Sequence, residues 1–275
     1  MTTLKLNLII AIAIFWMSPT HSQTEPTDYL RNGLPHNLEL IDELQSYQVI
    51  TDHINGDIFG NVFNRMRIQG IYTRGLEEGK VKWNNVTVVF SMQPEGDYPT
   101  GQPIDYMENY TYVPSADMLN PDKFQTFTEH SAFSKNLIWD MMGIEGLAWA
   151  CFDRLELNTQ FKATEFNEKL ELAGQGFFEN KNMILTWTGI STQNDELCAV
   201  IEFRTLNNPL NYGGEGMEMK GLSNYWGTIW VSLKDKQIEH AALYENVTME
   251  ILLPGQTAKQ LMNTIREIQV TKLIP

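Results

Sequence analysis

The sequence has few of the residues that usually build reactive centres. Of its 275 residues, only 2 are cysteines and 5 are histidines. It contains no HExxH or CxxC pattern and no two histidines four residues apart, and the stretch Asp52-His53-Ile54-Asn55-Gly56-Asp57 lacks the ligand spacing of an EF-hand. The GxSxG and SxxK motifs of nucleophilic serines are also missing. We therefore predict neither a bound metal nor a cofactor.

Positive charge is scarce as well. The chain has 20 Lys and Arg against 34 Asp and Glu, a formal net charge of −14. A field of this sign repels phosphate backbones and anionic lipid surfaces. The glycine-rich stretch 213–216 lacks the Lys and Ser or Thr of a phosphate-binding loop. Nucleic acid is therefore not an expected partner.

Long apolar runs are limited to one, near the N-terminus. Residues 6–16 are almost entirely apolar, Lys5 precedes them, and small or polar residues follow up to Ser22. This is the layout of a secretory signal, and the run is much shorter than the ~20 residues of a membrane-spanning helix. We predict a cleaved signal peptide at 1–22 and a secreted or periplasmic protein. No cysteine follows the apolar run to form a lipoprotein anchor, and no later segment is predicted to span a membrane.

The two cysteines, Cys151 and Cys198, leave two readings open. In an oxidising compartment they permit one disulfide. Both also lie in apolar stretches, where thiols behave as small buried hydrophobic groups.

Hydrophobic patterning after the signal predicts one β-rich domain. Residues 23–36 are polar and form an expected leader or linker, and 37–275 form the expected domain. Residues 37–47 have apolar positions at helical spacing and predict a short amphipathic helix. Two β-rich runs within 62–92 surround a charged turn and predict a hairpin. Five prolines and several tyrosines within 93–130 predict a long irregular loop with ordered aromatic packing.

The second half of the domain predicts a buried helix and a meander of strands. Residues 135–157 are apolar on nearly every side, which is typical of a buried helix, and Gly143 and Gly146 favour a break within it. Strands are predicted from residue 182 onward, with a glycine-rich loop at 206–222 and a final strand at 261–273. The predicted fold class is α+β or mainly β: a curved antiparallel sheet of meander hairpins with a central buried helical segment packed against it.

A two-residue turn within Lys234–Gln237 would place Val231 opposite His240 and Gly227 opposite Tyr244. Trp226 and Trp230 would then lie together on the other face of the sheet. Since both faces of this ribbon are apolar, we expect both to be covered, one by the central helix and the other by loops or a ligand.

The hairpin that begins Tyr225-Trp226-Gly227-Thr228-Ile229-Trp230 resembles a hairpin of the periplasmic lipoprotein-carrier half-barrels, over residues 225–253. That family holds acyl chains between a curved antiparallel sheet and helices. The resemblance implies this fold and a lipidic ligand, and it implies no role for any individual residue.

Three functional hypotheses follow. The first is non-enzymatic binding of an apolar or amphipathic ligand, because linings of Met and Trp suit such molecules; the candidate ligand-binding residues are Trp139, Met142, Trp149, Trp226 and Trp230. The second is a structural or surface-interaction module with a protein partner. The third is an extracellular hydrolase that uses two of the carboxylates Asp140, Glu145 and Asp153 beside aromatic platforms.

Overall fold

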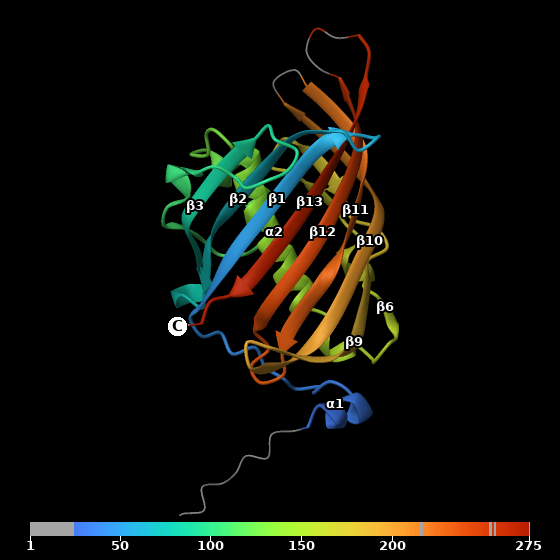
Figure 1. The fold of residues 1–275 in the computed structure, drawn as a ribbon. Helices are drawn as coiled ribbons and strands as arrows, with labels where there is room; N and C mark the ends of the chain where they lie inside the picture. Colours follow the sequence, from blue (N-terminus) through green and yellow to red (C-terminus); the bar gives the residue numbers. More distant parts are fainter. Residues whose placement is uncertain (1–24, 215–216, 253–254, 256, 275) are drawn as a thin grey trace, which may run out of the picture.

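The computed structural model describes residues 25–214, 217–252, 255 and 257–274. The predicted signal peptide lies outside these residues. Within them, one curved antiparallel sheet surrounds a single long helix (Figure 1). The helices are α1 Pro26–Asn32 and α2 Ser131–Trp149. The strands are β1 Gln45–Asp57, β2 Val62–Arg74, β3 Val81–Ser91, β4 Gln102–Pro103, β5 Tyr110–Tyr112, β6 Gln160–Lys162, β7 Lys169–Glu171, β8 Gly176–Glu179, β9 Ile184–Gln193, β10 Glu196–Gly214, β11 Met217–Ser232, β12 Ile238–Leu252 and β13 Gln260–Lys272.

The sheet is open, because its two edges do not pair with each other. Its strand order is β4-β3-β2-β1-β13-β12-β11-β10-β8-β7, with β9 and β6 continuing from another part of β10 and β5 pairing with β3. The first long strand, β1, therefore pairs with the last, β13, in the middle of the sheet. The other neighbouring long strands form hairpins, as the predicted meander requires, and the predicted fold class is confirmed.

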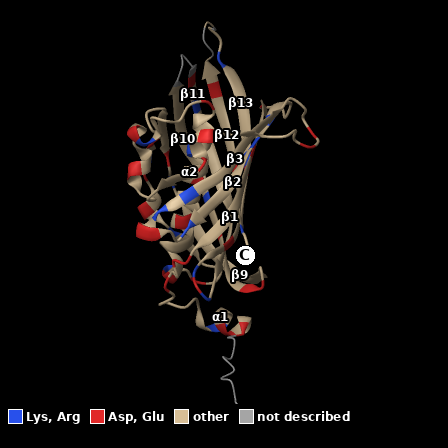
Figure 2. Ribbon diagram, turned by 90° about the vertical axis from the view of Figure 1, so that its left-hand side faces the viewer, with Lys and Arg blue, Asp and Glu red and all other residues tan. Residues whose placement is uncertain are grey.

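Side chains on one face of the sheet, the inner face, pack against α2. Because side chains alternate along a strand, residues paired across neighbouring strands share a face. One row of this face, fully buried or nearly so, consists of Val49, Val270, Ala241, Ile229, Ile201 and Trp187. Side chains of the long strands, from β3 at one side of the sheet across to β9 at the other, join α2 in one hydrophobic cluster. The core thus occupies the hollow of the sheet, and many of the acidic residues lie in the loops and helices on that side (Figure 2).

Glycines on the inner face allow neighbouring backbones to approach closely. A Cβ added at Gly227 would lie 2.5 Å from the Ala242 carbonyl oxygen, and one added at Gly221 would lie 2.4 Å from the Thr248 carbonyl oxygen. At Gly70 the nearest atom would be a methyl carbon of Val86, at 2.7 Å. Glycine is typical of strand positions where another backbone comes this close.

The central helix differs in detail from its prediction. It begins four residues earlier, at Ser131, continues through Gly143 and Gly146 without the predicted break, and ends at Trp149. A short 3-10 helix, Phe152–Arg154, follows it. An added Cβ at Gly143 would meet nothing within 4 Å, so this glycine faces open space.

The region 93–130 is irregular but packed, as predicted. It contains β4, β5 and the short 3-10 helices Asp105–Met107, Ala116–Leu119 and Pro121–Phe124. The ring of Phe127 lies 4.6 Å from that of Tyr106 and 5.1 Å from that of Tyr110. The segment contacts α2 through the ring of Phe124, 6.0 Å from that of Trp139, and through the Tyr106 hydroxyl, 2.9 Å from that of Ser134. Two further 3-10 helices, Glu77–Gly79 and Thr164–Phe166, complete the set in the described part of the chain.

Three local predictions were wrong. Residues 37–44 are not helical, and β1 begins at Gln45. The predicted leader contains α1, and its Leu34 is buried in the core cluster. The predicted loop 206–222 belongs almost wholly to β10 and β11, which remain paired as far as Gly214 and Met217.

The predicted pairing of β11 with β12 was wrong by one residue. The turn is longer than two residues, since the Ser232 amide donates to the Gln237 carbonyl oxygen. An irregularity between Trp230 and Val231 then shifts the register, and Trp226 lies opposite Tyr244. Trp226 and Trp230 still share the outer face, as predicted.

Candidate functional site

The space between α2 and the sheet is filled by side chains. Trp83, Trp187, Met141 and Ile144 are each at most 1% exposed. A sealed interior of this kind leaves no open cavity for a ligand beneath the central part of α2.

One buried ionic cluster joins α2 to β12 and β13. The Arg266 guanidinium donates to the Asp140 carboxylate and, at 2.6 Å, to Glu245, whose other oxygen accepts from the Ser223 hydroxyl at 2.6 Å. Burial raises the pKa of Asp140 to about 6, although Arg266 opposes the rise. Near this cluster His53 Nε2 is buried without a hydrogen-bond partner among the described residues, as is Arg266 Nε.

A second cluster joins α2 to β2. The Tyr72 hydroxyl donates to Glu145 at 2.9 Å, and Arg74 Nε lies 3.7 Å from the same oxygen. Arg74 donates to Asp42 at 2.9 Å and to Gln237 at 3.5 Å, and its guanidinium stacks on Trp149. Burial raises the pKa of Glu145 to about 7, because Arg74 and Tyr72 compensate only part of the cost of removing the carboxylate from water.

The candidate hydrolase carboxylates do not form a catalytic pair. Asp140 is bound to Arg266, Glu145 lies against Arg74, and the half-exposed Asp153 accepts from Lys236 at 3.3 Å. Raised carboxyl pKa values are typical of general acids, but Asp140 and Glu145 are buried within separate ion pairs. The arrangement gives the hydrolase hypothesis no support.

The five candidate ligand-binding residues are divided between two faces. Trp139, Met142 and Trp149 lie on α2 and pack against the core cluster. The indole nitrogens of the two tryptophans donate to backbone carbonyls of Met118 and Lys236. Trp226 and Trp230 lie on the outer face, where Trp226 is 41% exposed and stacks on Tyr244. The five do not line one site, since three lie on α2 and two on the outer face, and the described loops do not cover Trp226.

The cysteines are both free and buried, so the disulfide that the even count permits does not form. Burial raises the pKa of Cys151 to about 11 and that of Cys198 to about 12. Thiols with such pKa values are poor nucleophiles, and the reading as small buried hydrophobic groups is the one that the structure supports.

An apolar row that sequence reasoning missed crosses the far end of the inner face. It lies where β10 to β13 extend past the N-terminal end of α2 (Figure 1). Strand pairing places Leu210, Gly221, Met249 and Met262 in line, and pairing of β10 with β8 and of β8 with β7 extends the line. We call the following side chains the distal strip: Leu170, Phe178, Leu210, Met219, Met249, Ile251 and Met262.

The distal strip is separate from the core. Six of its seven side chains are half-buried, and Ile251 is buried. None belongs to the core cluster or is among the apolar side chains packed against it. A mainly polar row, with Val247 as its apolar member, separates the two regions: Thr264 donates to Asn55 at 2.8 Å, Ser223 donates to Glu245, and Asn208 is fully buried. The inner face therefore carries a second apolar surface that α2 does not cover.

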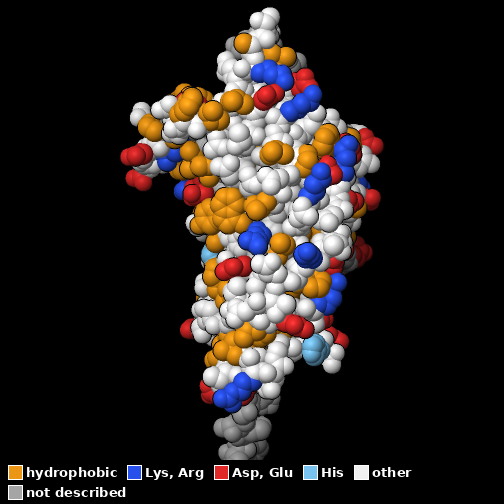
Figure 3. All heavy atoms as spheres, turned by 90° about the vertical axis from the view of Figure 1, so that its right-hand side faces the viewer, with side chains coloured by type: hydrophobic (Ala, Val, Ile, Leu, Met, Phe, Trp, Pro, Cys, Tyr) orange, Lys and Arg blue, Asp and Glu red, His pale blue; other side chains and the backbone are white. Residues whose placement is uncertain are grey.

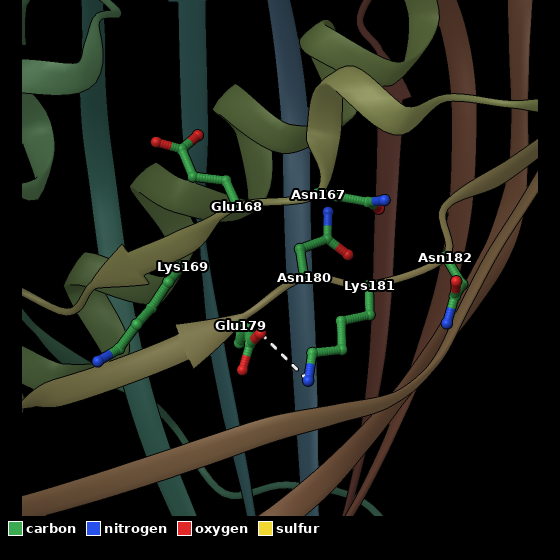
Figure 4. A pocket seen from close by; sticks show the side chains of 7 residues that line it. All are labelled: Asn167, Glu168, Lys169, Glu179, Asn180, Lys181 and Asn182. Carbon is green, nitrogen blue, oxygen red and sulfur yellow. Dashed lines mark ion pairs between the residues drawn. The ribbon is translucent and has the colours of Figure 1, made fainter.

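Two polar cavities lie near the edge of the sheet. The first, about 170 Å³, lies at the base of the β7–β8 hairpin (Figure 4). In it Lys181 points toward Glu179, with their charged atoms 3.1 Å apart. The second, about 230 Å³, lies beside β9 and β10. The first cavity is lined by Asn, Glu and Lys, and most of the residues that line the second are polar or charged. Such linings suit water better than an apolar molecule.

Other classes of site find no support in the described residues. No group of three or more His, Cys, Asp or Glu side chains there could hold a metal ion. Asp52 lies in β1 and pairs with Arg67 at 2.7 Å, while Asp57 accepts hydrogen bonds within the β1–β2 turn. No helix in the described part of the chain is long and apolar enough to cross a membrane.

Comparison with known proteins gives structural similarity but no family. No family model matches the chain, and no curated protein matches its sequence. A solved structure titled "Lipid-protein interactions in lipovitellin" is similar with a TM-score of 0.45 and 13% identity. The match covers 84% of this chain and 25% of the lipovitellin chain, so this chain spans about a quarter of that protein's length.

Proposed function

We propose that this protein binds an apolar or amphipathic ligand, without catalysis, on the distal strip. The observation that supports the proposal is the second apolar surface itself. A row of apolar side chains crosses β7, β8, β10, β12 and β13 on the inner face and lies outside the core cluster. An apolar surface left beside a complete core is typical of an interaction site.

The dimensions and chemistry of the strip suit a lipid chain. Neighbouring strands are about 4.8 Å apart, so the row from β7 to β13 is about 24 Å long. The hydrocarbon layer of one bilayer leaflet is about 15 Å thick, which is about the length of an acyl chain. One acyl chain therefore fits along the row. Met219, Met249 and Met262 supply flexible, polarisable side chains that adapt to ligands of varied shape.

The ligand is expected on the strip and not beneath α2. The core side chains under α2 are almost fully buried, and two ionic clusters hold the helix to the sheet. Opening that interface would separate Asp140 from Arg266 and Glu145 from Tyr72 and Arg74, which is costly. The strip needs no such rearrangement.

The test is binding of a fluorescent fatty acid to the purified protein, with native mass spectrometry to identify any lipid that purifies with it. Met249→Ser removes apolar contact from the strip and should weaken binding about tenfold, which corresponds to about 1.4 kcal/mol. Leu222→Ser is the matched control, because Leu222 is also apolar, follows Gly221, the β11 residue opposite Met249, and faces outward. Equal affinity in the two variants, or no binding by the wild type, would remove the proposal.

The same protein is proposed to act outside the cytoplasm, in a secreted or periplasmic location. The support is the signal layout of residues 1–22. N-terminal sequencing of the protein from its host should give Gln23 as the first residue. A chain that retains Met1 in the cytoplasm would contradict this location.

A second candidate function, contact with a protein partner, is favoured by one observation on the outer face. Trp226 and Tyr244 stack with ring centroids 6.1 Å apart and are 41% and 40% exposed. Exposed aromatic residues are enriched at protein interfaces. Trp226→Ser should abolish capture of such a partner without affecting fatty-acid binding, and retained capture would remove this candidate.

A further inference from the structure

The end of the molecule next to the distal strip carries an exposed apolar tip, and Figure 3 shows hydrophobic side chains gathered on a protrusion near this end, at the upper left. It consists of Ile58 and Phe59 in the β1–β2 turn, Phe63 at the start of β2 and Leu261 at the start of β13. Their side chains are 46%, 84%, 44% and 49% exposed. A protruding turn with a phenylalanine this exposed is uncommon unless it contacts something.

The β1–β2 turn is built to hold Phe59 outward. One carboxylate oxygen of Asp57 accepts from the Phe59 and Asn61 amides, each at 2.9 Å, and the other accepts from the Asn61 side chain at 2.7 Å. Gly60 adopts a φ of 89°, which favours glycine. The turn is thus ordered by its own hydrogen bonds, and the exposure of Phe59 is a property of the folded turn.

The tip lies at the same end of the sheet as the distal strip. Asp57, the last residue of β1, lies opposite the strip residue Met262 of β13. Leu261 precedes Met262 in β13 and, because side chains alternate along a strand, lies on the outer face, whereas the strip lies on the inner face. The strip and the tip therefore reach the end of β1 and β13 from opposite faces, and a ligand that leaves the strip past this end passes the tip.

The charges around the tip favour a surface without net charge. Asp57 is the only charged residue from Ile54 to Asn64, and its carboxylate is occupied by the turn. Lys259 is paired with Glu250 at 2.6 Å. Glu95 and Asp97 flank Gly96, whose carbonyl accepts from Arg65 of β2 at 2.8 Å. These acidic groups near the base of the turn would repel an anionic membrane surface.

We propose that Ile58, Phe59, Phe63 and Leu261 form a membrane-docking tip that inserts into the interface of a zwitterionic lipid bilayer. Phenylalanine and aliphatic side chains enter the headgroup–acyl boundary, and binding increases with the apolar area inserted. The docking is independent of ligand binding; its role, to let the strip exchange a lipid with the bilayer, rests on the proposed function.

Vesicle flotation of the protein purified after export tests the proposal, with phosphatidylcholine vesicles and with the same vesicles containing phosphatidylserine. Phe59→Ser should lower binding to phosphatidylcholine vesicles roughly tenfold or more, and Phe59→Trp should retain it. Leu44→Ser is the matched control: Leu44 is 64% exposed, but it precedes the opposite end of β1. Phosphatidylserine should weaken binding of the wild type.

Several outcomes would overturn the docking tip. They are a wild type that does not float, a Phe59→Ser protein that floats as well as the wild type, or binding that increases with phosphatidylserine. A wild-type dimer that Phe59→Ser converts to a monomer would assign the tip to contact between copies. Affinity for a dispersed fatty acid separates the two proposals: Phe59→Ser should leave it unchanged and Met249→Ser should lower it. Phe59-dependent flotation without fatty-acid binding would support the tip and remove the proposed function.

Discussion

Replacing the buried carboxyl of Glu145 should change how the stability of the protein depends on pH. Glu145 lies on α2 with its side chain 8% exposed, and burial raises its pKa from 4.5 to about 7. A carboxyl whose pKa is higher in the folded than in the unfolded state favours folding when protonated. Its contribution is complete below about pH 4.5 and is lost as the pH rises to about 7. At about 1.36 kcal/mol per pKa unit, the whole loss is about 3 kcal/mol.

The variant Glu145→Gln removes this titration and keeps an acceptor for Tyr72. The free energy of unfolding of the variant minus that of the wild type should therefore increase by about 2 kcal/mol between about pH 5 and about pH 8. Urea unfolding at both pH values measures it. The difference between two proteins cancels other groups, including His53, whose pKa burial lowers. Glu43→Gln, which removes an exposed carboxyl, is the control. A difference that stays constant or decreases with pH would refute the reasoning.

Three further predictions test the packing. Arg266→Met should lower the free energy of unfolding by about 3–5 kcal/mol in urea, because it leaves Asp140 and Glu245 buried without their partner; a loss below about 1 kcal/mol would contradict the buried cluster. Gly227→Ala should destabilise the sheet by more than about 1 kcal/mol, since its Cβ would meet backbone at 2.5 Å, whereas Gly143→Ala, which meets nothing within 4 Å, should stabilise α2 by up to about 1 kcal/mol; thermal unfolding that shows the reverse order would contradict the glycine contacts. Cys151 and Cys198 should not react with Ellman's reagent until the protein unfolds, and rapid reaction of the native protein would show that a thiol is exposed.

Regular alternation made much of the sheet predictable. The hairpin at 62–92, the strands after residue 182 and the final strand all followed from apolar and β-branched residues at every second position. The central helix was recognisable because its apolar residues surround it. Its start was not recognisable, because the first turn contains the polar residues Ser131 and Ser134. The Ser134 hydroxyl contacts Tyr106 of the preceding loop and the His130 carbonyl oxygen, and neither contact can be seen in the sequence.

Contacts between distant segments could not be predicted from one sequence. Asp140 and Arg266 meet across 126 positions, and nothing local to α2 identifies Arg266 as the partner. The distal strip was hidden for another reason. Gly213, Gly221 and several Asn residues made 206–222 look like a loop, although Gly221 is there because a Cβ would collide with the Thr248 carbonyl. Apolar residues two positions apart, Leu210 and Tyr212 in one strand and Met249 and Ile251 in another, were the signal that could have revealed the strip.

The most direct test of ligand binding on the distal strip is methyl NMR of the protein labelled at its methionines. On titration with a fatty acid, the resonances of Met219, Met249 and Met262 should shift, while those of the buried Met66, Met107 and Met141 should not. Shifts confined to Met66, Met107 and Met141 would place the ligand beneath α2, and unchanged spectra would mean that the strip binds no fatty acid. Either result would contradict the account.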